Sequence, residues 1–346
     1  METGPTPAGA ARPGCTGWKP APPLYRQQTL MQALIFDHNL ELKEIPRPAI
    51  GPGEALVRVR LAGICRTDLE VLRGYHSFRG IPGHEFVGEV VGPPESDLVG
   101  QRVVGEINIP CGVCPRCRRG LARHCRERRV LGLRGHDGAF AQYLTLPRDN
   151  LHPVPDALTD DAAVFTEPLA AALAVSEAAP ADLDQRVLVI GDGTLGLLIS
   201  FTLALRGLNT HLAGHYPEHL RLAEPYGVKT FLENELASGE FDLVVEASGS
   251  PGGLDLALDR VRPRGTVVLK STFAGCVPLD PALLVVPEVR LVGSRCGPFP
   301  AALRLLTQGW LDPRPLVSRV FPLSQGVAAL DWARQKGVLK VLLAAS

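Results

Sequence analysis

Apolar and polar residues alternate over short runs in the first part of the chain, from Met31 to about Asn150. The runs MQALIFD, EALVRVRLAGIC and FVGEVVG show this pattern, and glycine or proline interrupts the sequence about every dozen residues. A period of two with frequent turn residues predicts short strands in a small, barrel-like β region. The segment LTDDAAVFTEPLAAALAVSEAA, residues 158–179, then predicts a helix that Thr159 caps.

The pattern changes near residue 185, where continuous apolar runs begin to alternate with helical segments. RVLVIGDG predicts a buried strand that enters a glycine turn, and TLGLLISFTLALRGL predicts an apolar helix. THLAGH, FDLVVEASGS, GTVVLKS and VRLVGS predict further strands, most of them separated by helical segments. This alternation predicts a parallel, doubly wound α/β sheet. The remaining chain predicts two more helices and the closing strand VLKVLL.

Residues 1–30 differ from the rest of the chain because they contain six prolines and few apolar residues that a core needs. We expect this segment to be disordered and the folded protein to begin near Met31. A misassigned upstream start, a tail and a targeting segment all remain open. Its two arginines are few for a transit peptide, which disfavours the last alternative.

Composition narrows the class of protein. The 346 residues are enough for two domains, and the formal net charge of +0 gives no general attraction to nucleic acid or anionic membranes. No apolar run approaches the roughly 18 residues of a membrane span. Eight cysteines without a secretory leader disfavour a disulfide framework. We therefore expect a cytoplasmic protein that uses clustered thiols to bind metal.

The sequence Gly191-Asp192-Gly193-Thr194-Leu195-Gly196 follows a predicted strand and precedes a predicted helix. In this context G-x-G-x-x-G predicts a dinucleotide site, with the pyrophosphate at the start of the helix. The alternative is a glycine turn that binds nothing.

The end of the next strand bears on the choice between NAD and NADP. An NAD site usually has a carboxylate there for the ribose hydroxyl, but this chain has Gly214 and His215. With His215 and Arg221 as possible donors, the sequence favours NADP. Alternatively, His215 is a surface residue and NAD binds without the acidic contact.

Four cysteines, Cys111, Cys114, Cys117 and Cys125, follow the spacing C-x2-C-x2-C-x7-C. They supply enough thiolates to close a tetrahedral zinc site, which would then be structural. A redox pair is the weaker alternative. Seven arginines between Arg116 and Arg129 raise the possibility of nucleic-acid binding. The neutral chain and the absence of aromatic residues in this loop favour a solvated or subunit-facing surface instead.

A second set of potential ligands is spread along the chain: Cys65 in GICRTD, His84 and Glu85 in PGHEFVG, and Glu167 in FTEPLA. Three protein ligands with an exchangeable fourth position make a Lewis acid. Singly, each residue also has an ordinary structural explanation.

In this order, GICRTD, GHEFVG, the cysteine loop, TEPLA and GDGTLG resemble the zinc-dependent medium-chain dehydrogenases, nearest their threonine and sorbitol dehydrogenase-like branch. The resemblance implies an α/β protein with a GroES-like β-barrel-type catalytic domain and a Rossmann domain. The implied limits are 31–160 and 300–346 for the catalytic domain, and 161–299 for the Rossmann domain. A structural zinc lobe is implied at 105–130.

The resemblance also implies two zinc ions per chain, the catalytic one among Cys65, His84 and Glu167. Either Glu85 or water would complete that site. Thr67 would pass on the substrate proton, and Arg66 would contact the cofactor pyrophosphate. Many relatives have a histidine five residues after the ligand cysteine, whereas this chain has Glu70, so the relay runs through Glu70 and water or stops at Thr67.

The implied reaction is hydride transfer between an alcohol or polyol and its carbonyl, with the substrate oxygen on the catalytic zinc and NAD(P) as cofactor. The alternatives are an NADPH-dependent carbonyl reductase and a non-catalytic nucleotide-binding protein. We expect a small-molecule substrate, no nucleic-acid or membrane partner, and a homodimer or homotetramer. Tyr75, His76 and Phe78 are candidates for the substrate pocket, and Cys276 and Cys296 are expected to be buried.

Overall fold

A computed structural model describes Met1 and residues 29–74, 77–236, 240–272 and 275–345. Most of residues 1–30, which we expect to be disordered, lie outside these ranges, as do the candidates Tyr75 and His76. The first strand begins at Leu30, next to the predicted start of the fold at Met31. That strand, β1 (Leu30–Asp37), forms an antiparallel hairpin with β2 (Asn39–Pro46).

Among the described residues, strands from the first part of the chain and from its end form a seven-stranded sheet of order β10-β5-β4-β3-β18-β17, in which β9 also pairs with β3. Two of its strands, β17 and β18, come from the end of the chain. The strands are β3 (Glu54–Ile64), β4 (Glu85–Gly92), β5 (Arg102–Gly105), β9 (Tyr143–Pro147), β10 (Leu151–Pro153), β17 (Val317–Pro322) and β18 (Lys340–Ala344). A small sheet contains β6 (Asn108–Ile109), β7 (Arg129–Leu131) and β8 (Gly135–His136).

The described residues of the second part form a six-stranded, wholly parallel sheet of order β13-β12-β11-β14-β15-β16. This is the 3-2-1-4-5-6 order of a doubly wound dinucleotide-binding sheet, so the predicted α/β class is confirmed. The strands are β11 (Arg186–Ile190), β12 (Asn209–Gly214), β13 (Lys229–Leu232), β14 (Phe241–Glu246), β15 (Val261–Leu269) and β16 (Arg290–Gly293).

Buried apolar residues explain the position of the central strand. In β11, Val187 and Val189 belong to one core cluster, and Leu188 and Ile190 belong to another. A strand covered on both faces carries apolar residues at successive positions, as RVLVI does.

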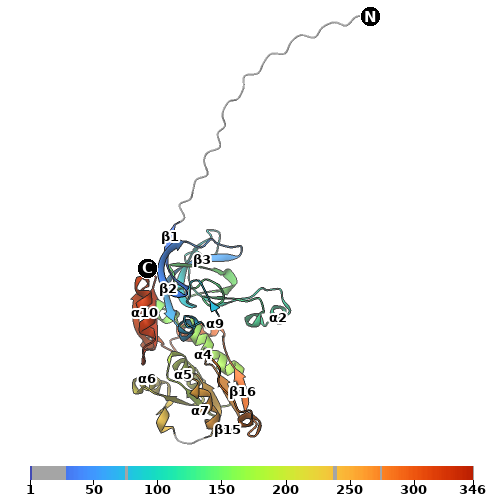
Figure 1. Cartoon of the computed structure of the whole chain (residues 1–346), viewed down its shortest axis with the longest axis vertical. Helices are drawn as coiled ribbons and strands as arrows, with labels where there is room; N and C mark the ends of the chain where they lie inside the picture. The colour runs from blue at the N-terminus through green and yellow to red at the C-terminus, as the bar shows by residue number, and fades with distance from the viewer. Residues whose placement is uncertain (2–28, 75–76, 237–239, 273–274, 346) are drawn as a thin grey trace.

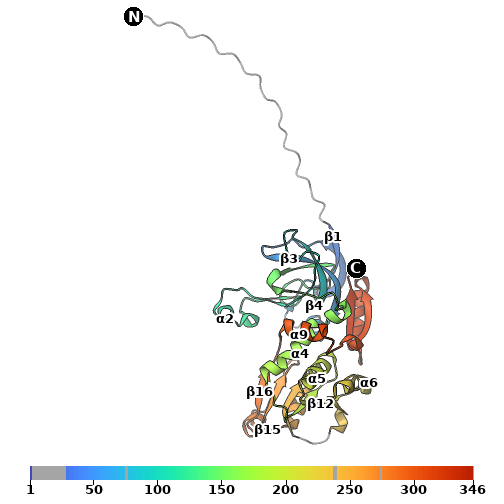
Figure 2. The ribbon, with the colours of Figure 1, turned by 180° about the vertical axis from the view of Figure 1, so that it is seen from behind.

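The helices cover both sheets and join them, and α4 lies at the junction (Figures 1 and 2). They are α1 (Arg66–Val71), α2 (Pro115–Arg118), α3 (Asp160–Ala163), α4 (Thr166–Ala178), α5 (Thr194–Leu205), α6 (Pro217–Arg221), α7 (Gly252–Arg260), α8 (Ala282–Val285), α9 (Phe299–Thr307) and α10 (Gly326–Ala333). The loop that carries α2 projects sideways from the first sheet in both views.

The single helix predicted over 158–179 is wrong, because the structure divides it into α3 and α4. Pro168 has no N–H to donate to Val164, so it fits the first turn of a new helix rather than the interior of a long one. The hydroxyl of Thr166 donates to the carbonyl of Ala163 at 2.7 Å. Thr159 occupies the N-cap position of α3 but makes no side-chain capping bond.

Candidate active site and cysteine lobe

A cavity of about 370 Å³ lies where the two sheets meet. Its walls include Cys65 and Thr67 from the start of α1, Glu167 from α4, and Gly193 from the glycine turn. The ends of β14 and β15 also contribute residues. Ligands of α/β sheets bind beyond the carboxyl ends of parallel strands, so this position suits a nucleotide and a substrate together.

Cys65, His84 and Glu85 bring one ligand atom each to within 4.8 Å of one another. The sheet explains this meeting, because β3 and β4 are antiparallel neighbours with Gly63 opposite Glu85. Cys65 directly follows β3, and His84 directly precedes β4. A thiolate, an imidazole and a carboxylate suit Zn²⁺, so this donor set fits the expected catalytic metal.

Asp68, which the sequence analysis missed, supports two of these residues. Its carboxylate lies 3.0 Å from Nδ1 of His84 and accepts the backbone N–H of Cys65 at 2.8 Å. Burial favours the neutral imidazole, but Asp68 and Cys65 together raise the pKa of His84 well above 6.5. The Asp68 bond engages Nδ1 and leaves Nε2 as the nitrogen that can bind a metal.

Glu85 is paired with Lys340, a second residue that the sequence analysis missed. The Lys340 ammonium group donates to Oε2 of Glu85 at 2.6 Å and to the carbonyl of Ile64 at 3.2 Å. Burial alone would lower the pKa of Lys340, but the charge of Glu85 and its neighbours raises it. Oε1 of Glu85 is buried and has no hydrogen-bond partner among the described residues. Such an oxygen suits a cation, although Oε2 is already engaged.

Glu167 lines the same cavity but lies outside the 4.8 Å cluster. Desolvation raises the pKa of its carboxyl, and the nearby His84 opposes this shift. The structure therefore brings three of the four predicted ligands together and places the fourth in the same cavity.

The residues expected to move the proton differ in position. Thr67 and Arg66 line the cavity, and the Arg66 side chain is exposed. Glu70 is buried on α1, outside the cavity lining, and accepts a hydrogen bond from Arg73 at 2.9 Å. Nε of Arg66 lies 3.9 Å from the same carboxylate.

Each of the three glycines in the turn has a different structural role. Gly191 has φ of +110°, and a Cβ there would lie 2.6 Å from the carbonyl oxygen of Ala247. A Cβ at Gly196 would lie 1.8 Å from the oxygen of Gly191, so α5 could not pack against the strand. A Cβ at Gly193 would meet nothing within 4 Å. This free space beside the N-terminus of α5 fits a pyrophosphate.

A carboxylate does lie at the end of β12, but it belongs to Asp192 of the glycine turn. Its Oδ2 accepts the backbone N–H groups of His215 and Tyr216 at 2.9 and 2.7 Å. A Cβ at Gly214 would lie 2.4 Å from the Asp192 side chain, so glycine makes room for it. The His215 side chain is exposed and lies 3.5 Å from Glu233.

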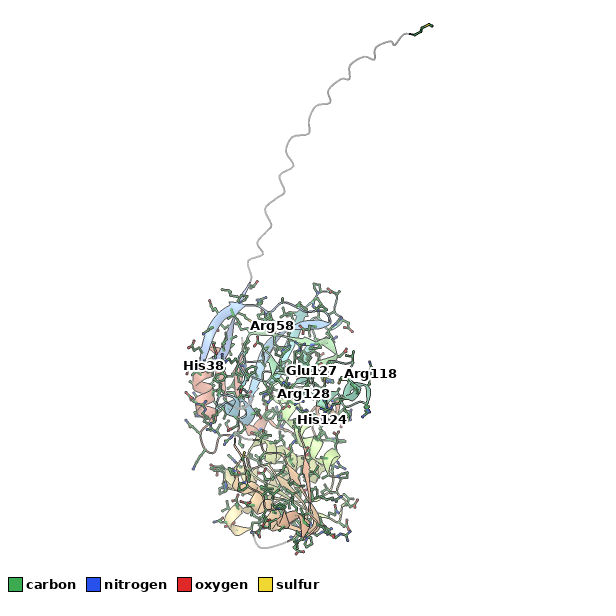
Figure 3. The ribbon with its side chains drawn as sticks, turned by 45° about the vertical axis from the view of Figure 1, so that its right-hand side comes forward. His38, Arg58, Arg118, His124, Glu127 and Arg128 are labelled. Atoms are coloured by element: carbon green, nitrogen blue, oxygen red, sulfur yellow. The ribbon has the colours of Figure 1, made fainter. Side chains whose placement is uncertain are left out.

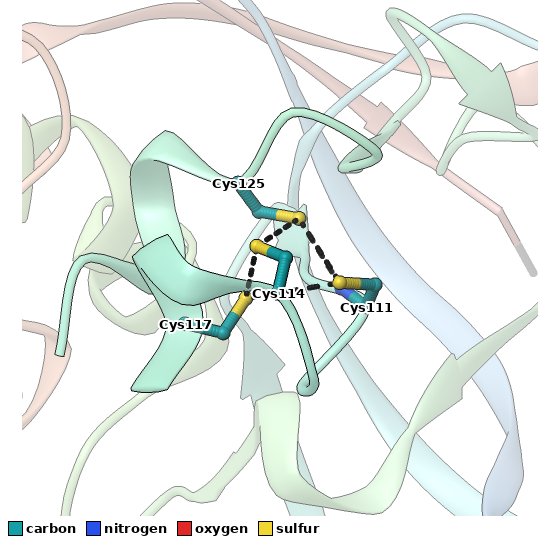
Figure 4. Close-up of side chains that lie close together, drawn as sticks. All are labelled: Cys111, Cys114, Cys117 and Cys125. Atoms are coloured by element: carbon teal, nitrogen blue, oxygen red, sulfur yellow. Dashed lines mark hydrogen bonds between the residues drawn. The ribbon is translucent and has the colours of Figure 1, made fainter. Parts of the chain in front are cut away.

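Figure 4 shows the four predicted cysteines converging in the lobe at 105–130. Four of their sulfur–sulfur separations are 3.5, 3.5, 3.9 and 4.0 Å. A tetrahedral zinc site with bonds of about 2.3 Å has edges of about 3.8 Å, so the arrangement fits Zn²⁺. The amide of Cys117 lowers the pKa of Cys114 to about 6, whereas desolvation raises that of Cys117 to about 12.

Three side expectations are corrected. Phe78 is buried in the hydrophobic core and does not line the cavity. Cys276 is exposed rather than buried. Cys296 is half-buried, lines the cavity, and accepts a hydrogen bond from Asn108 at 3.3 Å. These positions depend on loop packing that the local sequence does not encode.

Comparison with known proteins identifies the family. The alcohol dehydrogenase GroES-like domain matches residues 51–156. A D-altritol 5-dehydrogenase from Agrobacterium fabrum is 34% identical over an alignment of 308 residues, and the match covers 82% of this chain and 90% of the relative. Other relatives include L-threonine 3-dehydrogenases.

Solved structures agree with this assignment. A zinc-binding dehydrogenase from Sinorhizobium meliloti 1021, bound to NADP, has a TM-score of 0.83 and 29% identity, covering 92% of this chain and 100% of the other. An alcohol dehydrogenase from Escherichia coli CFT073, complexed with NADH, has a TM-score of 0.82 and 27% identity, covering 91% and 99%. The chain is an oxidoreductase of the zinc-dependent medium-chain dehydrogenase family, in the threonine and sorbitol dehydrogenase-like branch.

The described helices do not meet the requirements of a membrane span. None of them combines the length and the apolar character that crossing a bilayer needs.

Proposed function

We propose that this chain interconverts an alcohol or polyol and its carbonyl by hydride transfer to and from a nicotinamide dinucleotide, with Cys65, His84 and Glu167 holding a catalytic zinc. The carrying observation is that the Cys65–His84–Glu85 cluster shares one cavity with Gly193 of the dinucleotide turn. When bound there, zinc supplies Lewis-acid stabilisation of negative charge that develops on oxygen.

The chain's own residues position the reactants. Asp68 orients His84, and the glycine turn with α5 seats the pyrophosphate, assisted by Arg66. The Thr67 hydroxyl accepts the substrate proton and passes it outward. The relay through Glu70 and water stays a prediction, since Glu70 lies outside the cavity lining and is paired with Arg73.

The cofactor preference is proposed to be for NAD. The sequence favoured NADP because no carboxylate follows β12, but Asp192 supplies one from the glycine turn. Glu233 adds a second carboxylate beside His215. Negative charge at this position repels a 2′-phosphate and can accept a ribose hydroxyl. Competitive titrations with NAD and NADP test this point, and tighter binding of NADP would overturn it.

Cys111, Cys114, Cys117 and Cys125 are proposed to hold a second, structural zinc, because their sulfur separations match a closed tetrahedral site. A homodimer or homotetramer and a cytoplasmic location stay predictions from the sequence.

Zinc per chain, measured by elemental analysis with alcohol and carbonyl turnover alongside, tests the proposal. We expect two zinc ions in the native protein and one in Cys65→Ser, with turnover falling roughly 1,000-fold, as the loss of about 4 kcal/mol of Lewis-acid stabilisation implies. Cys276→Ser, at an exposed cysteine away from both clusters, is the matched control and should keep two zinc ions.

The opposite results are equally informative. Full turnover in Cys65→Ser would refute the catalytic-zinc assignment. Two zinc ions and bound cofactor without turnover of any alcohol or carbonyl would favour a non-catalytic nucleotide-binding protein. Turnover of carbonyls with NADPH alone would favour the carbonyl reductase.

A further inference from the structure

Positive charge dominates the cavity wall. Among the described residues that line it, the carboxylates are Glu85 and Glu167. The lysines and arginines are Arg66, Arg128, Arg134, Lys270, Arg295 and Lys340. Lys340 is neutralised by Glu85, and Arg66 lies near Glu70. The remaining cations therefore exceed what the cavity's own carboxylates can balance.

Three of these cations, Arg128, Arg134 and Arg295, form a group that we call the arginine wall. They come from two parts of the chain: Arg128 and Arg134 flank β7, and Arg295 follows β16. Arg295 contacts Asn108 of β6, and Asn108 pairs with Val130 of β7, the strand that Arg128 and Arg134 flank. In the described part of the chain, no carboxylate lies within 4.0 Å of any of them.

Neutral acceptors hold two of the guanidinium groups in place. Arg295 donates to Oδ1 of Asn108 at 3.2 Å and to the carbonyl of Arg123 at 2.6 Å. Arg128 donates to the carbonyl of Cys125 at 3.4 Å, while its Nε is buried without a partner. These acceptors carry no net charge. The nearby sulfur groups of Cys125 and Cys296 can offset part of the charge at Arg128, but no carboxylate of the described residues does so.

Lys270 adds to this charge from the second sheet. Its ammonium group is buried and donates to the carbonyls of Ala171 and Arg295 at 2.9 and 2.8 Å. Arg134 and Arg295 are exposed, but Arg128 is half-buried and Lys270 is buried, and buried cations are unfavourable unless an anion joins them. The pyrophosphate is proposed to sit at Gly193 and the start of α5, on other elements than the arginine wall, which leaves the wall for a different anion.

We propose that the substrate carries a terminal oxyanion, a carboxylate or a phosphate, which the arginine wall binds while the reacting carbon faces Cys65 and His84. This inference rests on the proposed dehydrogenase function. Guanidinium groups bind such oxyanions through paired, charge-assisted hydrogen bonds that a hydroxyl group cannot match. A neutral polyol would leave the wall unpaired and bind less well.

Matched six-carbon substrates test the inference. Sorbitol, gluconate and sorbitol 1-phosphate differ only at carbon 1, and mannitol, mannonate and mannitol 1-phosphate repeat the comparison with other stereochemistry. We expect kcat/KM for one oxyanionic class to exceed that of the neutral polyol by at least ~10-fold, the value of one charge-assisted bond. The substrate class with the higher kcat/KM shows whether the wall binds a carboxylate or a phosphate. Added NaCl should reduce the preference because it screens the charges.

Arg134→Met should reduce this preference about 10-fold, whereas Arg118→Met should preserve it. Arg134 and Arg118 are both exposed. Figure 3 shows Arg118 at the outer edge of the cysteine lobe, whereas Arg128, another member of the arginine wall, lies nearer the body of the molecule. Equal or better use of the neutral polyols would overturn the inference. An unchanged preference in Arg134→Met, with altered oligomeric state, would assign the wall to a subunit contact and overturn it as well.

Calorimetric titration of the cofactor-loaded protein with inorganic phosphate, at constant ionic strength, separates this inference from the proposed function. Phosphate binding that weakens about 10-fold in Arg134→Met but not in Arg118→Met supports the wall even if no substrate reacts. In that case the dehydrogenase proposal alone fails. Turnover of alcohols or carbonyls without phosphate binding and without an oxyanion preference would refute the inference about the arginine wall and leave the dehydrogenase proposal standing.

Discussion

Replacing Lys340 by methionine should leave the buried carboxylate of Glu85 without its lysine partner. The two side chains are 4% and 1% exposed, and their charged atoms lie 2.6 Å apart. Removing one member of a buried ion pair costs about 3–5 kcal/mol. With an unfolding entropy of about 2.1 cal/mol/K per residue, a chain of this length should lose about 5 °C in melting temperature.

Calorimetry of the zinc-loaded protein measures this shift. Lys336→Met removes an exposed lysine from the same region and should change the melting temperature by less than about 1 °C. The double variant Lys340→Met/Glu85→Gln should recover most of the loss, because no uncompensated charge remains. A Lys340→Met protein as stable as Lys336→Met would show that water or a rearranged Glu85 satisfies the carboxylate, contrary to the buried pair described above.

Three further changes test other parts of the site. Asp68→Asn should lower zinc retention against a chelator and turnover by about 10- to 100-fold, because the ligand imidazole loses its carboxylate partner; unchanged zinc retention would refute this. Cys114→Ser should remove one zinc ion per chain and lower the melting temperature without the loss of the other zinc, and intact stability would contradict a structural role. Asp192→Asn keeps an acceptor for the two amides but removes the charge, so kcat/KM with NADP relative to NAD should rise about 10-fold; a constant ratio would exclude Asp192 as the determinant.

The order of motifs along the chain was sufficient to predict the family and most of the secondary structure. Strand–helix alternation after residue 185 predicted the parallel sheet because its strands, such as RVLVI, are apolar on both faces. The cysteine spacing predicted the converging sulfurs because all four lie in one short loop, where covalent proximity limits the alternatives. Pro168 was an available signal for the break between α3 and α4, and it was overlooked.

Only the tertiary structure showed which distant residues complete the site. Antiparallel pairing of β18 with β3 brings Lys340 beside Glu85, although 255 residues separate them. Asp192 reaches the end of β12 because β11 and β12 are adjacent, so a carboxylate from the glycine turn fills the space left by Gly214 at the end of β12. The arginine wall likewise joins segments far apart in sequence. Local patterns determine strands, helices and short-range ligand spacing, whereas charge balance in a cavity depends on contacts that form only when the sheets assemble.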